Sequence, residues 1–327
     1  MAPELSAAVI GASGIGKHHA KWFARLGCSL DAIAGSSPES VTRTCETLQG
    51  MFGFDGEGYP SVEEMLAAGS YDLISVCSPE EMHYDHFMRA LDHGAHVLCE
   101  KPIVFDHDLD PGTMLSRAEE MVEAAADAGR VAAVNTQYAA GVDSYHALMA
   151  RRGADPGPPA TFFMQMESRG GEEGTDYEQI FIDLGPHPIS VLMGFCGPGR
   201  MLEGSASCTV EQKCVEAEFD YEMDAGGVCR ARIVCRNRPE GDLVRRYGIN
   251  DMLVDYEGRN DEEGVYRAYL TYDGDETCAQ DFMESSLERF VAAVRGDAHA
   301  PLAPIEDGLR NLQIQLALLE IGRRTQA

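Results

Sequence analysis

The chain has 327 residues, of which 26 are Lys or Arg and 54 are Asp or Glu, so its formal net charge is −28. A surface this acidic repels a phosphate backbone, which excludes general nucleic-acid binding. The sequence has no apolar run near the ~20 residues that a membrane helix needs, and its start does not resemble a signal peptide. We therefore expect a cytoplasmic protein that does not enter a membrane.

The ten cysteines include no Cys-x-x-Cys pair. This pattern favours reduced, mostly buried thiols over a disulfide scaffold or a zinc site. Two histidine pairs, His83/His86 and His93/His96, have metal-like spacing but lack a third ligand nearby. We expect no metal site.

The first 135 residues alternate short apolar runs with amphipathic stretches. Alternation of this kind predicts a parallel sheet with helices on both faces. The expected strands are Ser6–Ile10, Leu30–Ala34, Leu73–Cys77, Ala95–Cys99 and Val131–Asn135, and the expected helices are His18–Leu26, Pro38–Leu48, Glu80–Asp92 and Pro111–Ala128.

After about residue 155 the pattern changes to consecutive strands separated by Gly- and Asp-rich turns, which predicts a mostly antiparallel sheet. These strands are expected at Ala160–Glu167, Met201–Cys208, Cys214–Met223, Gly227–Cys235, Asp251–Tyr256 and Tyr266–Tyr272. Two helices, Gln280–Arg295 and Pro304–Arg323, are expected to close the chain.

The first strand runs directly into the glycine-rich segment Gly11-Ala-Ser-Gly-Ile-Gly16. A tight turn here lets the backbone approach a pyrophosphate, and the following helix presents free N–H groups to negative charge. Ser13 takes the middle slot of the G-x-G-x-x-G pattern, and Gly14 follows one place later. The position of this segment predicts a dinucleotide-binding turn that involves Gly11, Ser13, Gly14, Ile15 and Gly16.

The second expected strand ends in Ala34-Gly-Ser-Ser37, without an Asp or Glu at its tip. A carboxylate there would bond the ribose of NAD and repel the 2′-phosphate of NADP. The hydroxyls of Ser36 and Ser37, with Arg43, are candidates to hold that phosphate. We expect NAD(P) as the cofactor and favour NADP.

Ligands of open α/β sheets lie at the carboxyl ends of the strands. One expected strand is followed by Ser78-Pro79 with His83 behind it, and the next by Glu100-Lys101-Pro102. Lys101 is one of only four lysines and lies where a substrate beside a nicotinamide is expected. The alternative is a solvated lysine at a strand end.

Asp183 and His187 lie four residues apart, a spacing that puts two side chains on one face of a helix. A neighbouring carboxylate can fix the orientation of an imidazole that acts as an acid or a base. Pro186 and Pro188 interrupt this segment, because proline fits only the first turn of a helix. The helix therefore starts near Pro186 or is distorted there.

Together these motifs resemble the Gfo/Idh/MocA family of oxidoreductases. The resemblance spans nearly the whole chain. It includes the Gly11–His19 turn, Ser78-Pro79 with His83, the stretches Ala90–Pro102 and Val131–Tyr138, the segment Asp183-x-Gly185-x-His187 and the closing stretch Pro304–Leu312.

The resemblance implies an α/β chain with an N-terminal Rossmann dinucleotide-binding domain, residues 1–136. Residues 137–327 are then a C-terminal α+β domain with a large, mostly antiparallel sheet, whose last helix is able to pack back on the first domain. It implies hydride transfer between the nicotinamide and a hydroxyl or keto carbon of a sugar, inositol or related polyol, with Lys101, Asp183 and His187 as the catalytic residues. It also implies a homodimer or homotetramer that uses the open face of the second sheet.

The expected cofactor-binding residues are Gly11, Ser13, Gly14, Ile15, Gly16, Ser36, Ser37, Arg43, Ser78, Pro79, His83, Glu100, Lys101 and Gln137. The expected substrate-binding residues are Lys101, Tyr138, Tyr177, Asp183 and His187. The loop 168–177, rich in Gly and polar residues, is either a cover for the site or a surface loop.

The chain also departs from the family pattern. Ser190 stands where the family often has a further Asp, and Gln179-Ile-Phe181 replaces a pair of glycines, which leaves the specific sugar open. Two alternatives share the resemblance: a redox-neutral enzyme that cleaves glycosides with a transiently used NAD, and a non-catalytic cofactor-binding regulator. The regulator should lack the Lys/Asp/His set that this chain has.

Overall fold

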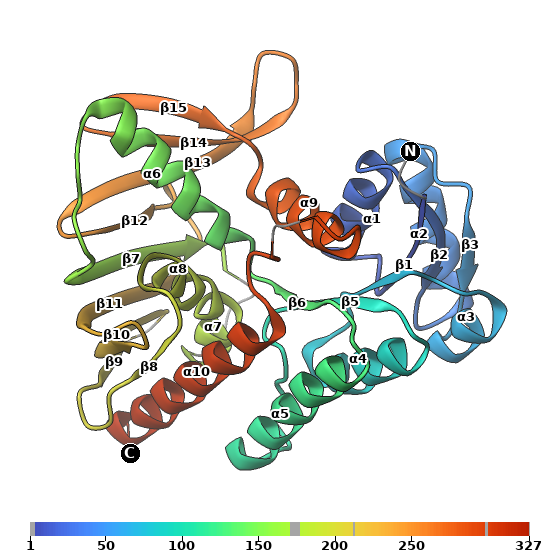
Figure 1. Ribbon diagram of the computed structural model, residues 1–327, viewed down its shortest axis with the longest axis horizontal. Coiled ribbons are helices and arrows are strands. Elements are labelled where there is room, and N and C mark those ends of the chain that lie inside the picture. The colour runs from blue at the N-terminus through green and yellow to red at the C-terminus, as the bar shows by residue number, and fades with distance from the viewer. Residues whose placement is uncertain (1–3, 171–176, 212, 298–299, 327) are drawn as a thin grey trace. The chain divides into compact units, whose positions relative to one another are not determined.

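The computed structural model describes residues 4–170, 177–211, 213–297 and 300–326, and the chain forms two compact units (Figure 1). Unit 1 consists of Met1–Thr136 and Met283–Leu309, and unit 2 of Gln137–Phe282 and Arg310–Ala327. Within the described residues, no helix combines the length and the apolar character that crossing a bilayer requires.

Unit 1 contains a six-stranded parallel sheet in the order β3-β2-β1-β4-β5-β6. Its strands are β1 (Leu5–Ile10), β2 (Cys28–Ala34), β3 (Glu57–Tyr59), β4 (Leu73–Val76), β5 (His96–Glu100) and β6 (Ala132–Asn135). The five strands predicted from apolar runs are confirmed, whereas β3 was missed because its three residues Glu-Gly-Tyr form no apolar run. The strand order reverses between β1 and β4, which is the position where doubly wound sheets bind their ligands.

Helices cover both faces of this sheet (Figure 1). They are α1 (Gly16–Arg25), α2 (Pro38–Phe52), α3 (Val62–Ala68), α4 (His83–Asp92), α5 (Pro111–Asp127) and α9 (Phe282–Val294). A short 3-10 turn, η1 (Glu80–Met82), precedes α4, and α3 was missed by the sequence interpretation.

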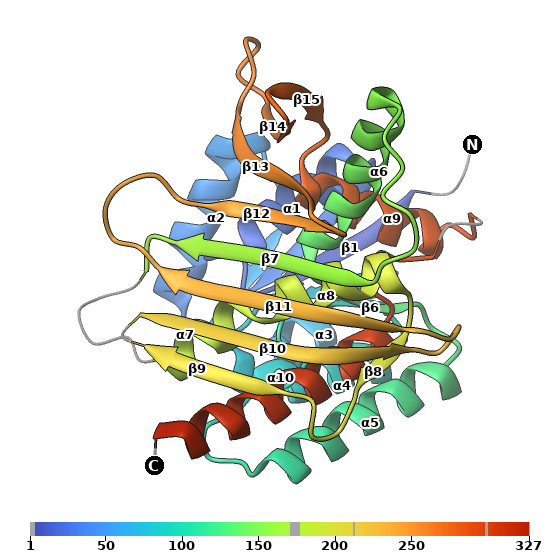
Figure 2. The ribbon, with the colours of Figure 1, turned by 90° about the vertical axis from the view of Figure 1, so that its left-hand side faces the viewer.

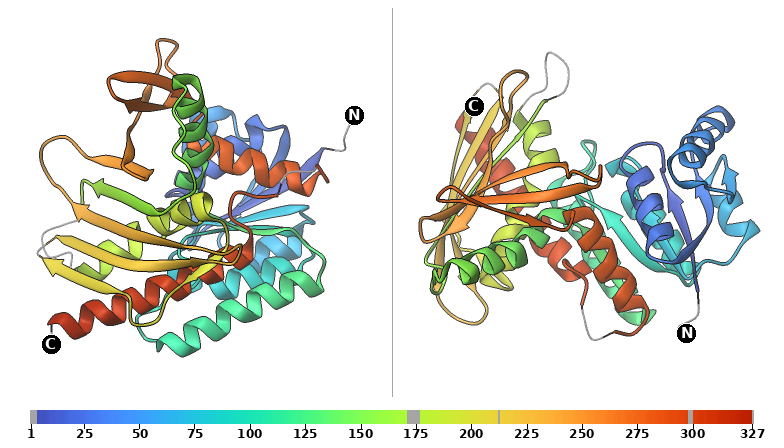
Figure 3. Two further views of the ribbon diagram at one scale, coloured as in Figure 1. Left: turned by 60° about the vertical axis from the view of Figure 1, so that its left-hand side comes forward. Right: turned by 90° about the horizontal axis from the view of Figure 1, so that it is seen from above.

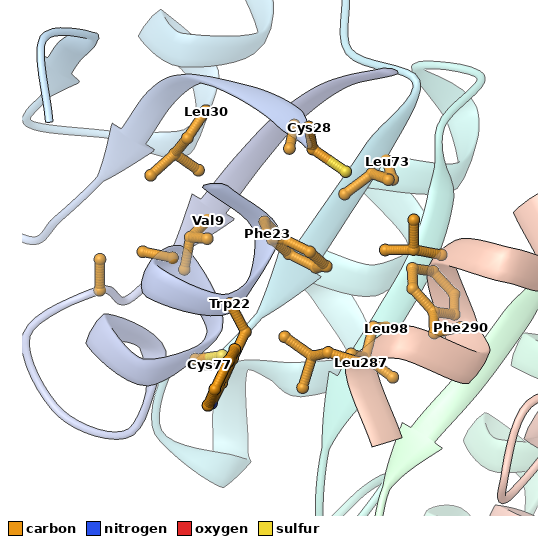
Figure 4. Packing of buried hydrophobic residues seen from close by; sticks show 14 of the residues in the cluster. Val9, Trp22, Phe23, Cys28, Leu30, Leu73, Cys77, Leu98, Leu287 and Phe290 are labelled. Atoms are coloured by element: carbon orange, nitrogen blue, oxygen red, sulfur yellow. The ribbon is translucent and has the colours of Figure 1, made fainter. Parts of the chain in front are cut away.

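Helix α9 comes late in the chain but packs beside α1 on the same face of the first sheet (Figure 4). Its residues Leu287 and Phe290 are fully buried in one hydrophobic cluster with Trp22 and Phe23 of α1. The prediction that residues 283–309 belong to the second domain is therefore wrong. Both α9 and the start of the last helix, up to Leu309, belong to unit 1, where a Cβ at Gly308 would lie 2.5 Å from Val134 of β6. The last helix belongs to unit 2 from Arg310 onward.

Unit 2 contains a nine-stranded sheet in the order β15-β14-β13-β12-β7-β11-β10-β8, with β9 also paired to β10. Its strands are β7 (Thr161–Ser168), β8 (Gly199–Met201), β9 (Ser207–Glu211), β10 (Cys214–Met223), β11 (Val228–Asn237), β12 (Arg245–Ile249), β13 (Met252–Asn260), β14 (Tyr266–Tyr272) and β15 (Asp275–Ala279). The pairs are antiparallel except for β7 with β11, which confirms the mostly antiparallel prediction.

Some boundaries in unit 2 differ from the prediction. The single strand expected at Met201–Cys208 is split into β8 and β9 by a turn at Gly204, which has a positive φ of 74°. Strands β12 and β15 were missed because neither is a continuous apolar run.

The helices of unit 2 lie on one face of its sheet (Figures 2 and 3). They are α6 (Gly141–Arg152), α7 (Tyr177–Leu184), α8 (Pro186–Cys196) and α10 (Ile305–Gln326), preceded by the 3-10 turn η2 (Gln137–Ala140). The opposite face carries rows of ion pairs, such as Arg232 with Glu216 and Arg246 with Asp255. The expected pairing of this face with a second subunit stays a prediction.

Candidate functional site

The glycine-rich segment forms a tight turn between β1 and α1. Gly11 has a positive φ of 82°, and a Cβ at this position would lie 2.5 Å from the Cys77 carbonyl oxygen. A Cβ at Gly16 would lie 2.5 Å from the Gly11 carbonyl oxygen. Only glycine fits at these two positions, because β1, the end of β4 and the start of α1 approach too closely for a side chain.

The surroundings of Gly14 differ from those of Gly11 and Gly16. A Cβ there would meet no atom within 4 Å, and the backbone φ is not positive, so the fold itself does not require glycine at this position. The following helix has no acidic residue in its first turn and no side-chain cap within the described chain. Room beside the turn and a helix start without acidic residues fit the phosphates of a dinucleotide.

A hollow of about 150 Å³ opens beside this turn. It is lined by Ser13 from the turn and by Ser40 and Arg43 from α2, among others. Ser36 is exposed at the end of β2, and the Ser37 hydroxyl caps α2 by accepting a hydrogen bond from the Ser40 amide at 3.2 Å. Ser40 was missed by the sequence interpretation, although its place in the first turn of the helix after Ser37 was a usable signal.

The segments after β4 and β5 are joined through a histidine. His83 is 1% exposed, and its ring nitrogens lie 2.7 Å from the Pro102 carbonyl oxygen and 2.9 Å from the Ser78 carbonyl oxygen. Burial lowers the pKa of His83. Because both ring nitrogens lie against carbonyls, His83 links the two segments, and its contact with a cofactor stays a prediction.

A buried polar network lies beneath the turn. His19 of α1 donates from Nε2 to Glu100 Oε1 at 2.9 Å and from Nδ1 to the Ser75 hydroxyl at 2.7 Å. Asn135 Nδ2 donates to the same Glu100 oxygen at 2.6 Å, and Asn135 Oδ1 accepts from the Ser286 hydroxyl at 2.7 Å. The network therefore joins α1, three neighbouring strands and α9.

The network contains a buried ion pair. Burial alone lowers the pKa of His19, but the neighbouring Cys77 and Glu100 raise it to about 10. Burial alone raises the pKa of Glu100, but the hydrogen bond and charge of His19, with Asn135 and Lys101, lower it to about 2. Both groups are therefore charged near pH 7. The Glu100 carboxylate forms this pair directly before Lys101 in the chain, and its contact with a cofactor stays a prediction.

In unit 2 the helical segment around Asp183 is broken, as Pro186 required. Helix α7 ends at Leu184 and α8 starts at Pro186, so Asp183 and His187 lie on two consecutive helices. Pro186 has no N–H to donate to the Ile182 carbonyl, four residues earlier. That carbonyl instead accepts a hydrogen bond from Gln315 Nε2 at 3.2 Å.

A second residue of helix α10, Asn311, also donates hydrogen bonds to the junction between α7 and α8. Asn311 Nδ2 donates to the Pro186 carbonyl at 2.7 Å and to the Ser190 hydroxyl at 2.8 Å. Asn311 and Gln315 lie four residues apart on the same face of α10 and are both buried. The sequence interpretation missed this pair, although two amides at helical spacing among apolar residues were the available signal.

His187 packs in an aromatic cluster that we define as Tyr138, His187, Tyr256 and Phe282. The Tyr138 ring lies 4.8 Å from the His187 ring and 5.6 Å from the Tyr256 ring, measured between centroids. Tyr256 stacks on Phe282 at 4.8 Å. All four side chains are buried, so the imidazole is held against a rigid, largely apolar wall.

The remaining predicted residues of unit 2 take different positions. Asp183 is exposed between the buried residues Ile182 and Leu184, and its negative charge contributes to the raised pKa of Tyr138, whose main cause is burial. Tyr177 starts α7 and donates from its hydroxyl to Glu178 at 3.1 Å. Gln137 opens η2, and residues 171–176 of the predicted loop lie outside the described residues.

The glycine turn between β1 and α1 and the reversal of strand order define unit 1 as a dinucleotide-binding Rossmann domain. Residues 5–136 match the family model of the Gfo/Idh/MocA oxidoreductases, described as an oxidoreductase family with an NAD-binding Rossmann fold. This match covers 132 of the 327 residues, all of them in unit 1.

The chain is 31% identical over 142 residues to a D-glucoside 3-dehydrogenase of Escherichia coli (strain K12), which covers 43% of this chain and 37% of that protein. It is 31% identical over 99 residues to an inositol 2-dehydrogenase of Rhizobium meliloti (strain 1021), which covers 30% and 28%. The chain thus matches about a third of the length of these relatives. A solved structure of the UDP-N-acetylglucosamine 3-dehydrogenase of Acidithiobacillus ferrooxidans has a TM-score of 0.72 at 17% identity and 98% coverage of both chains, which shows a shared fold.

The buried ion pair makes a testable contribution to stability. In Glu100→Gln the buried His19 loses its counter-ion, and we expect the free energy of unfolding to fall by about 3–5 kcal/mol. The double variant His19→Gln/Glu100→Gln removes both charges and should lose less. The pKa of His19 is raised from 6.5 to about 10, so its contribution is complete below about pH 6.5 and disappears as the pH rises to about 10. Denaturant titrations across this range measure both effects.

The exposed His146 provides the control, because His146→Gln should change neither the stability nor its pH dependence. Equal losses in the single and double variants, or the same decline from pH 6.5 to 10 in the double variant as in the wild type, would contradict a stabilising ion pair.

Proposed function

We propose that the protein is an NAD(P)-dependent dehydrogenase or reductase that acts on a CH–OH or keto carbon of a sugar, inositol or related polyol. The observation that carries the proposal is the turn at Gly11–Gly16, where a Cβ at Gly14 would meet open space and the first turn of α1 carries no acidic residue. The family match and the relatives named as glucoside and inositol dehydrogenases support it. All ten cysteines are free, which is consistent with the proposed cytoplasmic location.

The dinucleotide would be held by the turn and by the start of α1, and when bound it supplies the acceptor or donor of hydride. The adenosine ribose would lie at the end of β2, where Ser36 and Ser37 stand in place of an acid. Arg43 lines the adjacent hollow together with Ser13 and Ser40. We favour NADP because a guanidinium and hydroxyls suit a 2′-phosphate, whereas no carboxylate at the strand end repels it.

Removing hydride from an alcohol also requires removal of the hydroxyl proton. His187 is the group that we propose to take this proton, since a neutral imidazole held in one orientation is an effective base near pH 7. The proposed role of Lys101 is to donate a hydrogen bond to the reacting oxygen and to stabilise its developing negative charge. Asp183, as an exposed carboxylate, is proposed to bind substrate hydroxyls and to support the charged form of the histidine.

These roles predict the behaviour of two variants. Lys101→Met and His187→Ala should each lower kcat by about 10²–10⁴-fold, because each removes a group that acts on the reacting oxygen or its proton. The Kd for NADP+ should stay within about twofold. Reduction of NAD+ and NADP+ with a panel of sugars, inositols, sugar acids and glycosides identifies the substrate, and titration calorimetry measures the Kd.

The control for this experiment is His146→Ala, which alters an exposed histidine on α6. Near-normal turnover in either active-site variant would refute its assigned role. Glycoside cleavage without net reduction of the nicotinamide would indicate the redox-neutral alternative, and tight dinucleotide binding without any turnover would indicate a regulator.

The cofactor preference is tested separately with Arg43→Ala. Loss of a guanidinium from a phosphate typically costs about 1.5–3 kcal/mol, so the Kd for NADP+ should rise by at least about tenfold while the Kd for NAD+ stays unchanged. Arg89→Ala is a matched control, since Arg89 lies on α4 and pairs with Glu63. A parallel loss of both cofactors, or no loss of NADP+, would remove Arg43 from the phosphate site.

A further inference from the structure

Arg245 is an arginine on the helix-covered face of the second sheet. It is the first residue of β12, in which Tyr247 and Ile249 are buried. Alternate residues of a strand point to the same face, so the Arg245 side chain shares the face of Tyr247 and Ile249. Its partner in register on β7 is the buried Met166. The neighbouring Arg246 points to the open face.

The guanidinium of Arg245 reaches the aromatic cluster that holds His187. Its central carbon lies 5.9 Å from the centroid of the Tyr256 ring. Tyr256 contacts Tyr138 at 5.6 Å, and Tyr138 contacts His187 at 4.8 Å. The charge of Arg245 also acts on Tyr138, because it opposes the rise in the pKa of Tyr138 that burial causes.

Arg245 differs from the arginines of the open face in its partners. Arg246 donates to both carboxylate oxygens of Asp255 at 2.6 and 2.8 Å, and Arg230 and Arg232 also pair with carboxylates. In the described part of the chain, the Nε atom of Arg245 is buried and has no hydrogen-bond partner. Burying a charged donor without an acceptor is unfavourable, so a ligand that supplies the acceptor would remove this cost.

The ligand that suits this group is an oxyanion. A guanidinium is a planar fork of donors that matches the two oxygens of a carboxylate or phosphate, and it keeps its charge when buried. Asp183 and Asp281 place negative charge near Tyr138, so without Arg245 this region would repel an anion. A neutral sugar offers hydroxyl acceptors but no negative charge to balance the guanidinium.

We propose that Arg245 selects an anionic substrate, a polyhydroxylated molecule that carries a carboxylate or a phosphate, and that it binds that charged group beside His187. The inference rests on the proposed function, because it assigns the substrate class of the same histidine site. A carboxylate and a phosphate would be recognised by the same guanidinium chemistry, and the probes below distinguish between them.

The test compares matched charged and neutral probes on the intact protein in the presence of NADP+. D-Galacturonate is paired with D-galactose, and D-glucose 6-phosphate with D-glucose. We expect at least one anion to raise the midpoint of thermal unfolding of the wild type while its neutral counterpart does not. In Arg245→Met this shift should disappear, in Arg245→Lys it should partly return, and in the control Arg246→Met it should persist. The responding pair identifies carboxylate or phosphate.

For any probe that is turned over, kcat/KM of the anion in Arg245→Met should fall by about ten- to hundredfold, mainly through KM, with the Kd for NADP+ unchanged. The proposal is overturned if neutral probes shift the wild type as much as the anions do, if no anion shifts it, or if the shift survives in Arg245→Met. Failure of the proposed function has a different signature, namely no effect of Lys101→Met and His187→Ala on turnover or no binding of either dinucleotide.

Discussion

A buried charge needs a partner, and in this protein the pair His19–Glu100 is the interaction on which the nucleotide unit depends. The two residues lie on α1 and at the end of β5, 81 residues apart, and Ser75, Asn135 and Ser286 complete their hydrogen bonds. This hydrogen-bonded network thereby fixes α1, which follows the glycine-rich turn, and the end of β5, which precedes Lys101. Replacing such a pair by apolar residues is often neutral for stability, which suggests that its value here is the position of these two segments.

The second unit solves a comparable problem with amides in place of charges. Pro186 breaks the helix that carries Asp183 and His187, and a break leaves buried carbonyls without donors. Gln315 of α10 supplies the donor to the Ile182 carbonyl, and Asn311 donates to the Pro186 carbonyl at the start of α8. His187 therefore lies in the first turn of α8. Contacts of α10 hold the start of this helix, and the Tyr138 ring packs against the imidazole.

The sequence allowed prediction of whatever is imposed locally. The turn at Gly11 and Gly16 follows from steric necessity, and the effect of Pro186 follows from its missing N–H, so both are visible in a short window of residues. The placement of α9 was not visible, because Leu287 and Phe290 read only as an apolar helix face and do not reveal which sheet they cover. Arg245 was missed for a similar reason, since an arginine at the start of a strand usually points to solvent.

The central claim is that the turn after β1 binds a dinucleotide, and Gly14 tests it most directly. Gly14→Val adds a side chain where the protein itself leaves open space, so the account predicts unchanged thermal stability and loss of NADP+ binding in titration calorimetry. Gly50→Val, at an equally open glycine on α2, is the control and should bind as the wild type does. Wild-type affinity for NADP+ in Gly14→Val would contradict the account.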